Sequence, residues 1–164
     1  MQKFPYLKNV YHLIATLGGI GLMPFAPGTF GSIFAWIIFV FISHFLSTLS
    51  MLILTIISIF FAIWICEKIS RNLIEKDHKA IVIDELAGMW VALIPVVYFG
   101  SDQNERTIYA VSALILFRIF DIFKPYPISY FDQKFKNGFG IVFDDFIAGI
   151  FAGFLSTLIV IFLI

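Results

Sequence analysis

Two pairs of adjacent acidic residues stand beside long apolar stretches in this chain. One pair ends the run IVIDE at 81–85, the other ends IVFDD at 141–145, and an Ala-Gly pair follows each of them closely. A helix start is stabilised by a single carboxylate, whereas adjacent carboxylates repel each other unless a proton or a cation lies between them. The two segments are therefore either helix caps that resemble each other by coincidence, or related helix starts that present acids to one site.

Clustered carboxylates next to basic residues favour a metal and phosphate chemistry. Mg²⁺ prefers hard oxygen ligands and is usually bound through a few carboxylates, waters and substrate phosphate. Asp121, which follows an apolar run at 107–117, adds a fifth acid to the two pairs. The candidate catalytic residues and metal ligands are Asp84, Glu85, Asp121, Asp144 and Asp145.

Arg118 and Lys124 flank Asp121 at a spacing of three residues on either side. If a helix continues as far as Pro125, the three charged side chains share one face of it. They then form either an intrahelical series of ion pairs or a site in which Arg118 and Lys124 hold phosphate oxygens beside a metal. Asp132 lies in a more polar segment and is expected to be solvated.

The segment 12–32, HLIATLGGIGLMPFAPGTFGS, is apolar but dense in Gly and Pro. This composition interrupts regular helix, so a short helix followed by a re-entrant or interfacial loop is expected, with Ser32 as the N-cap of the next helix. Backbone N–H groups of such a loop can hold an anion, which makes Thr29 and Ser32 candidates for binding substrate phosphate. A loop that serves packing alone is the alternative.

The composition is that of a membrane protein. The 164 residues are 60% hydrophobic and include 21 Phe, and the mean hydropathy is +0.97, which exceeds what a soluble core requires. Long uncharged runs indicate transmembrane helices, and a net charge of zero gives no reason to expect nucleic-acid binding. We expect one all-α, polytopic domain over 1–164. Its five spans are predicted at roughly 32–47, 49–68, 86–100, from 107 onwards, and 146–164.

The distribution of Lys and Arg predicts how these spans are oriented. With five spans, ten of the eleven Lys and Arg residues fall on one side, and only Arg106 falls on the other. Basic loops stay in the cytoplasm, so the N-terminus, the segment 12–32 and all five acids are expected on the cytoplasmic face of the membrane.

Four segments together resemble the phosphatidylglycerophosphatase A family. They are GGIGLMPFAPGTFGS (18–32), IVIDELAGMW (81–90), FRIFDIFKPYPI (117–128) and GFGIVFDDFIAGIFA (138–152). The resemblance implies a small bacterial membrane enzyme that uses Mg²⁺ to remove the terminal phosphate of phosphatidylglycerophosphate, a phospholipid made on the cytoplasmic leaflet. It implicates Asp84, Glu85, Arg118, Asp121, Lys124, Pro125, Asp144 and Asp145.

Water is the nucleophile that we favour over an aspartate, because the chain has no D-x-D phosphoenzyme motif. A CDP-alcohol phosphotransferase should show a D-G-x-x-A-R run, which is absent. The main alternative is a transporter or ion-binding membrane subunit, which would place its acids at the membrane midplane between broken helices.

Overall fold

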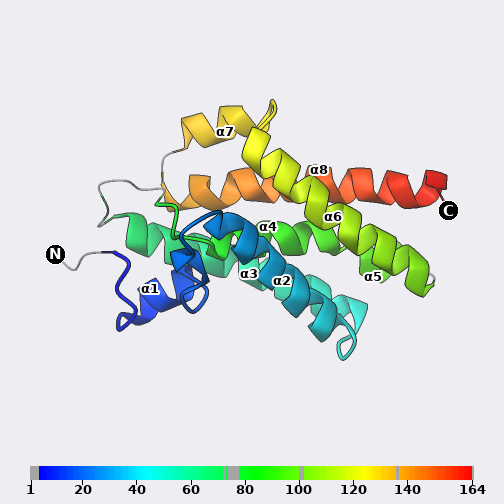
Figure 1. Ribbon diagram of the computed structural model, residues 1–164, viewed down its shortest axis with the longest axis horizontal. Helices are drawn as coiled ribbons and strands as arrows, with labels where there is room; N and C mark the ends of the chain where they lie inside the picture. The colour runs from blue at the N-terminus through cyan, green and yellow to red at the C-terminus, as the bar shows by residue number, and fades with distance from the viewer. Residues whose placement is uncertain (1–3, 72, 74–77, 100–101, 136, 164) are drawn as a thin grey trace.

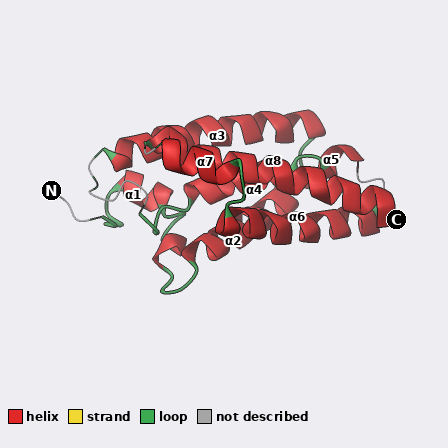
Figure 2. Cartoon of the chain, turned by 90° about the horizontal axis from the view of Figure 1, so that it is seen from above, coloured by secondary structure: helices red, strands yellow, loops and turns green. Residues whose placement is uncertain are grey.

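The structure of this chain is a computed structural model, and all the regular secondary structure that it describes is helical. The described residues are 4–71, 73, 78–99, 102–135 and 137–163, and they include no strand (Figure 2). This confirms the predicted all-α class. In chain order the elements are α1 (Val10–Ala15), the 3₁₀ helix η1 (Ile20–Leu22), α2 (Pro27–Ser43), α3 (Thr48–Ser70), α4 (Ile83–Leu93), α5 (Val96–Phe99), α6 (Gln103–Phe123), α7 (Ile128–Lys134) and α8 (Gly138–Leu163), as labelled in Figure 1.

Two of these helices are long and apolar enough to cross a membrane, judged by length and composition. They are α3 and residues Gly138–Phe162 of α8, while α2 is apolar but shorter. The predicted third span is interrupted, since α4 ends at Leu93 and Pro95 separates it from α5; proline has no N–H with which to continue a helix. The long α6 carries charged residues near both of its ends. Five spans therefore remain a prediction.

Helices α2 and α3 correspond to the first two predicted spans, 32–47 and 49–68, and form a helical hairpin whose first arm starts earlier than predicted. The turn between α2 and α3 includes Ser47, whose hydroxyl accepts the backbone N–H of Ser50 at 3.3 Å. The prediction that Ser32 caps the first arm is wrong, because α2 already begins at Pro27. Proline is well tolerated at the first position of a helix. Gly31 allows α2 to lie close to Val82, because a Cβ at position 31 would be only 2.9 Å from Cβ of Val82.

Helix α8 likewise begins before its predicted start at 146. Its first residue, Gly138, donates its N–H to Oε2 of Glu67 at 2.9 Å, and a Cβ on Gly138 would lie only 2.1 Å from the backbone nitrogen of Glu67. The ends of α3 and α8 are thus tightly joined. Asp144 and Asp145 consequently lie inside α8, about two turns from its start, which rules out a capping role for them.

Helix α4 occupies the centre of the bundle and packs against α2, α3, α6 and α8 (Figure 1). It approaches α8 most closely where two glycines meet: a Cβ on Gly149 would lie 2.3 Å from the carbonyl oxygen of Gly88, and one on Gly88 would lie 2.7 Å from that of Asp145. Small residues allow such contact between helix backbones. Large apolar side chains remain exposed around the bundle, among them Ile37, Phe41, Ile57, Phe60, Ile115, Phe154 and Phe162.

Candidate active site

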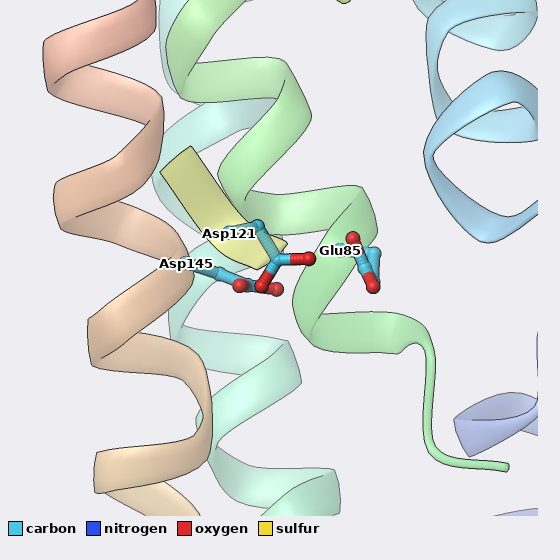
Figure 3. Close-up of side chains that lie close together, drawn as sticks. All are labelled: Glu85, Asp121 and Asp145. Carbon is cyan, nitrogen blue, oxygen red and sulfur yellow. The ribbon is translucent and has the colours of Figure 1, made fainter. Parts of the chain in front are cut away.

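Three carboxylates from three helices converge in the bundle. Glu85 of α4, Asp121 of α6 and Asp145 of α8 each place one oxygen within 4.8 Å of the others, and Figure 3 shows their side chains pointing toward one another. Glu85 and Asp145 are buried, and Asp121 is half-buried. We call these three residues the acid cluster.

The glycine contact between α4 and α8 positions two members of this cluster. Glu85 lies three residues before Gly88, and Asp145 lies four residues before Gly149. Both acids are therefore about one helical turn from the point where the two backbones meet. The similarity between IVIDELAG and IVFDDFIAG thus has a structural counterpart, in which two helices meet at their glycines with their acids side by side.

Arg118 binds two members of the acid cluster. Its Nη1 donates to Oδ2 of Asp121 at 2.8 Å and also to Oε2 of Glu85. The same Nη1 lies 3.1 Å from Oγ of Ser32, which in turn lies 2.7 Å from Oε2 of Glu85. The buried Nε of Arg118 has no hydrogen-bond partner. The predicted pairing of Arg118 with Asp121 on one helical face is confirmed.

The beginning of α2 lies directly against this group. A Cβ on Gly28 would lie 2.0 Å from Oε1 of Glu85 and 3.4 Å from Nη1 of Arg118, so a side chain there would displace the Glu85 carboxylate. Thr29 follows in the first turn of α2 and is half-buried. The structure therefore brings the predicted residue Ser32 to the acids, although from a helix and not from a loop, while Thr29 lies next to Gly28 in the first turn of that helix.

Lys124 does not share a face with Arg118 and Asp121, contrary to the prediction. The helix α6 ends at Phe123, and Lys124 adopts a left-handed conformation with φ +41°. Its ammonium group donates to Oδ1 of Asp132 at 2.7 Å and to Oδ2 of Asp144. Asp132, expected to be solvated, is thus half-buried in an ion pair.

The adjacent acids Asp144 and Asp145 consequently serve different groups. Successive residues of a helix point about 100° apart, so Asp145 joins the acid cluster while Asp144 contacts Lys124; the buried Oδ1 of Asp144 has no hydrogen-bond partner. Asp84 is buried in the first turn of α4, and its Oδ1 accepts the backbone N–H of Glu85 at 3.0 Å. Asp84 and Asp144 thus lie beside the acid cluster without belonging to it.

The electrostatics of the site follow from burial. Burial raises the pKa of Glu85 to about 7, and the Asp121 carboxylate adds to the rise, while Arg118 and Ser32 oppose it only in part. Burial lowers the pKa of Lys124, but the carboxylates of Asp144 and Asp132 outweigh that effect and raise its pKa above the usual range. The lysine therefore stays charged.

The acid cluster has the donor set of a hard divalent cation. Its three carboxylates are contacted by a single guanidinium, that of Arg118. The repulsion between the carboxylates of Glu85 and Asp121, which adds to the raised pKa of Glu85, would be relieved by a bound cation. Carboxylate oxygens at this spacing suit Mg²⁺, which keeps some waters and takes further oxygens from a substrate. The residues present thus fit such an ion.

Sequence reasoning missed two features of the site. Nothing in the sequence indicated that Asp132 pairs with Lys124, because this pairing depends on the turn between α6 and α7. The requirement for glycine at position 28 was hidden among neighbouring glycines and prolines, whose density was interpreted as a loop. The similarity of IVIDELAG and IVFDDFIAG was the signal for two helices that present acids to one site.

Comparison with known proteins places these residues in a family context. Residues 13–160 match the family described as phosphatidylglycerophosphatase A. Proteins of that name from Haemophilus influenzae and Escherichia coli are 38% and 33% identical to this chain; the alignments cover 89% and 88% of it, and 86% and 80% of the relatives. A putative phosphatidylinositol-3-phosphatase from Bacteroides thetaiotaomicron is 35% identical over 85% of this chain and 87% of its own length. No solved structure matches significantly.

Proposed function

Since the chain belongs to the phosphatidylglycerophosphatase A family, and is therefore a phosphatase, we propose that it hydrolyses phosphatidylglycerophosphate to phosphatidylglycerol with the help of Mg²⁺. The observation that carries the proposal is the acid cluster, in which three helices bring Glu85, Asp121 and Asp145 together beside Arg118. Such a site suits a phosphomonoester, whose charge must be matched by cations at the moment of cleavage.

The acid cluster is the proposed holder of the metal. Glu85, Asp121 and Asp145 each offer one oxygen, and Asp84 and Asp144 stay candidates for further ligands. Bound Mg²⁺ would neutralise the phosphomonoester and polarise its phosphorus. The raised pKa of Glu85 implies that the glutamate gives up its proton when a cation binds.

Arg118 and Lys124 are the proposed ligands of the phosphate oxygens. All the contacts of Arg118 with Glu85, Asp121 and Ser32 run through Nη1, and Nε is left without a partner, so the guanidinium retains donors for an anion. The first turn of α2, with Thr29, adds backbone N–H groups at the positive end of a helix dipole. Lys124 would exchange one of its two carboxylate partners for the substrate.

In the hydrolysis that we propose, water attacks phosphorus from the side opposite the glycerol oxygen. The bond from phosphorus to the glycerol oxygen breaks, and a carboxylate of the acid cluster accepts a proton from the water and passes it to the departing oxygen. Arg118 stabilises the charge that develops on the transferred phosphoryl group. Trapping a phosphorylated aspartate would overturn the choice of water as nucleophile.

We further propose that the single domain is a multi-pass protein of the bacterial inner membrane with this site on the cytoplasmic side. In support, α3 and α8 are long and apolar enough to cross a membrane, and large apolar side chains are exposed around the bundle. Lys3, Lys76 and Lys136, which contribute to the predicted orientation, lie outside the described residues. Labelling of single cysteines from either side of sealed vesicles tests the orientation.

The deciding experiment measures phosphate release by the purified protein on phosphatidylglycerophosphate, with and without Mg²⁺. Phosphatidic acid and phosphatidylinositol 3-phosphate serve as competing substrates, the latter because one relative carries a name of that specificity. We expect Mg²⁺-dependent release from phosphatidylglycerophosphate and little from the other two. Glu85→Gln should abolish it, whereas Glu105→Gln, near the start of α6 and far from Asp121, should not.

The same experiment separates the alternatives. Preferred release from phosphatidylinositol 3-phosphate would replace the proposed substrate while keeping the phosphatase. Absence of release from all three lipids, by protein shown to be folded, would favour the transporter or ion-binding subunit and turn the acid cluster into an ion site.

A further inference from the structure

A cavity of about 330 Å³ lies at the end of the bundle away from the acid cluster. It is formed where α2 ends, α3 begins, and α5 and the first turns of α6 pack alongside. Arg106 at its mouth precedes Asp121 by fifteen residues on the same helix, which corresponds to about 22 Å. The cavity is therefore separate from the proposed active site.

The walls of the cavity divide into an apolar interior and a polar mouth. Phe39, Val97 and Ala110 belong to the apolar part. Arg106 and Gln103 belong to the polar part and are exposed. Trp36 joins the two helices that enclose the cavity, since its indole N–H donates to the carbonyl oxygen of Ala110 at 2.7 Å. A volume of this size, with apolar side chains on one part of the wall and polar side chains on the other, suits a small amphiphile.

A second hollow, of about 460 Å³, runs along the outer face of α2 and shares part of its wall with the cavity. The shared residues are Trp36, Val40 and His44, and the groove is otherwise lined by Ile37, Phe41 and Phe45. The groove is almost wholly apolar, and it lies on the surface that faces lipid if the chain spans a membrane. Two hydrocarbon chains of one molecule could thus lie on either side of Trp36.

Arg106 places a guanidinium at the mouth. The imidazole of His44 also lines the cavity, with Nδ1 2.7 Å from the carbonyl oxygen of Val40. No carboxylate lines the cavity among the residues that the structure describes. A guanidinium recognises phosphate oxygens through paired N–H donors, so a phosphate ester fits the mouth better than a neutral headgroup.

From these features we propose that the cavity and groove bind one phospholipid with an anionic headgroup. Its phosphate would lie at Arg106, one acyl chain would enter the cavity between α2 and α6, and the other would follow the groove on α2. A phospholipid is preferred to a free fatty acid because the groove adjoins the cavity at Trp36, Val40 and His44, so that two acyl chains of one molecule can be held side by side. This site is independent of the proposed hydrolysis.

Native mass spectrometry of the detergent-purified protein tests the proposal. Phosphatidylglycerol, phosphatidylcholine with the same acyl chains, and oleate are titrated separately, in EDTA so that no divalent cation holds lipid at the acid cluster. We expect one phosphatidylglycerol to be retained at least about tenfold more tightly than either competitor, equivalent to about 1.4 kcal/mol. Arg106→Gln should remove the preference over phosphatidylcholine.

A matched pair of variants on α6 tests the location. Val111→Trp fills the cavity at a partly exposed position, while Ile115→Trp adds the same bulk one turn further on, at a residue that does not line it. We expect Val111→Trp to abolish retention and Ile115→Trp to preserve it. Equal affinity for the lipids, equally strong binding of oleate, or unchanged binding by both Arg106→Gln and Val111→Trp would overturn the proposal.

Phosphatase activity is read separately on the same preparations. Val111→Trp should hydrolyse phosphatidylglycerophosphate at the rate of Ile115→Trp, because position 111 lies ten residues, or about 15 Å along α6, from Asp121. Intact hydrolysis without selective lipid binding would refute the lipid site alone. Selective binding without hydrolysis would refute the phosphatase alone.

Discussion

Replacing Gly88 by alanine should disturb the acid cluster without changing any of its carboxylates. The added Cβ would lie 2.7 Å from the carbonyl oxygen of Asp145 and 2.8 Å from Cε2 of Phe117, whereas ordinary contacts begin near 3.4 Å. Backbone atoms of α8 cannot rotate away as a side chain can, so α4 and α8 must separate by about 0.7 Å. Glu85 would then move away from Asp145 by a similar amount.

The expected loss is large because catalytic groups must be held within about 0.5 Å of their productive positions, and displacement by about 1 Å can cost roughly 100-fold in rate. We expect kcat/KM of Gly88→Ala on phosphatidylglycerophosphate to fall about tenfold to 100-fold, and its Mg²⁺ requirement to rise. Overpacking should also lower the free energy of unfolding by about 1–3 kcal/mol, offset by about 1 kcal/mol from the better helix propensity of alanine.

Gly153→Ala is the matched control on the same pair of helices. Its Cβ would lie 3.1 Å from the carbonyl oxygen of Ala92 and 3.3 Å from the Tyr109 hydroxyl, which demands only a few tenths of an ångström. Both variants are assayed for Mg²⁺-dependent phosphate release and for unfolding in detergent. Wild-type kcat/KM and Mg²⁺ dependence in Gly88→Ala would refute the claim that the glycine contact positions the acids, and equal losses in both variants would reduce the effect to general destabilisation.

Four further predictions concern single groups. Asp145→Asn should abolish hydrolysis while folding and membrane insertion persist, and wild-type turnover would exclude Asp145 as a metal ligand. With the pKa of Glu85 raised to about 7 from an ordinary 4.5, protons should compete with Mg²⁺, so half-maximal activity should require about tenfold more Mg²⁺ at pH 6 than at pH 8; an unchanged requirement would contradict this. The folded, metal-free state binds that proton more tightly than the unfolded chain, so the stabilising contribution of Glu85 should be complete below pH 4.5 and be lost as the pH rises through 7, as acid–base titration of the unfolding midpoint can show. Tyr109→Phe removes a hydroxyl 3.0 Å and 2.9 Å from the carbonyl oxygens of Ala92 and Gly153 and should cost about 1 kcal/mol of unfolding free energy, with an unaltered unfolding curve as the contrary result.

The sequence allowed the helical class to be predicted, and the five predicted acids include the three that cluster, because both predictions depend on local patterns. Uncharged runs indicated helices, and acids beside those runs stood out against an apolar background. The hairpin turn near Ser47 was likewise marked by local polar residues, and the structure places α2 and α3 on either side of it.

The predictions that failed concern Ser32 and Lys124. Ser32 was expected to cap a helix, yet it lies within α2 because Pro27 starts the helix and Gly28 makes room for Glu85. Lys124 was expected on one face with Arg118, but it ends α6 and turns to Asp132 and Asp144. The pairing of Lys124 with Asp144 cannot be read from spacing, since the partner is remote in sequence. The start of α2 at Pro27 is a local signal that was obscured by the density of Gly and Pro in 12–32.

The joint between Gly138 and Glu67 bears on how deep the chemistry would take place. It brings the start of α8 and the last turn of α3 to one level, and Asp145 lies seven residues further along α8, or about 10 Å below that level. If both helices span the bilayer, a lipid phosphate bound at the acids sits well beneath the plane of its neighbours' headgroups. Water and the headgroup layer would then have to reach down to the acids, so the substrate would be hydrolysed where the membrane is locally thinned.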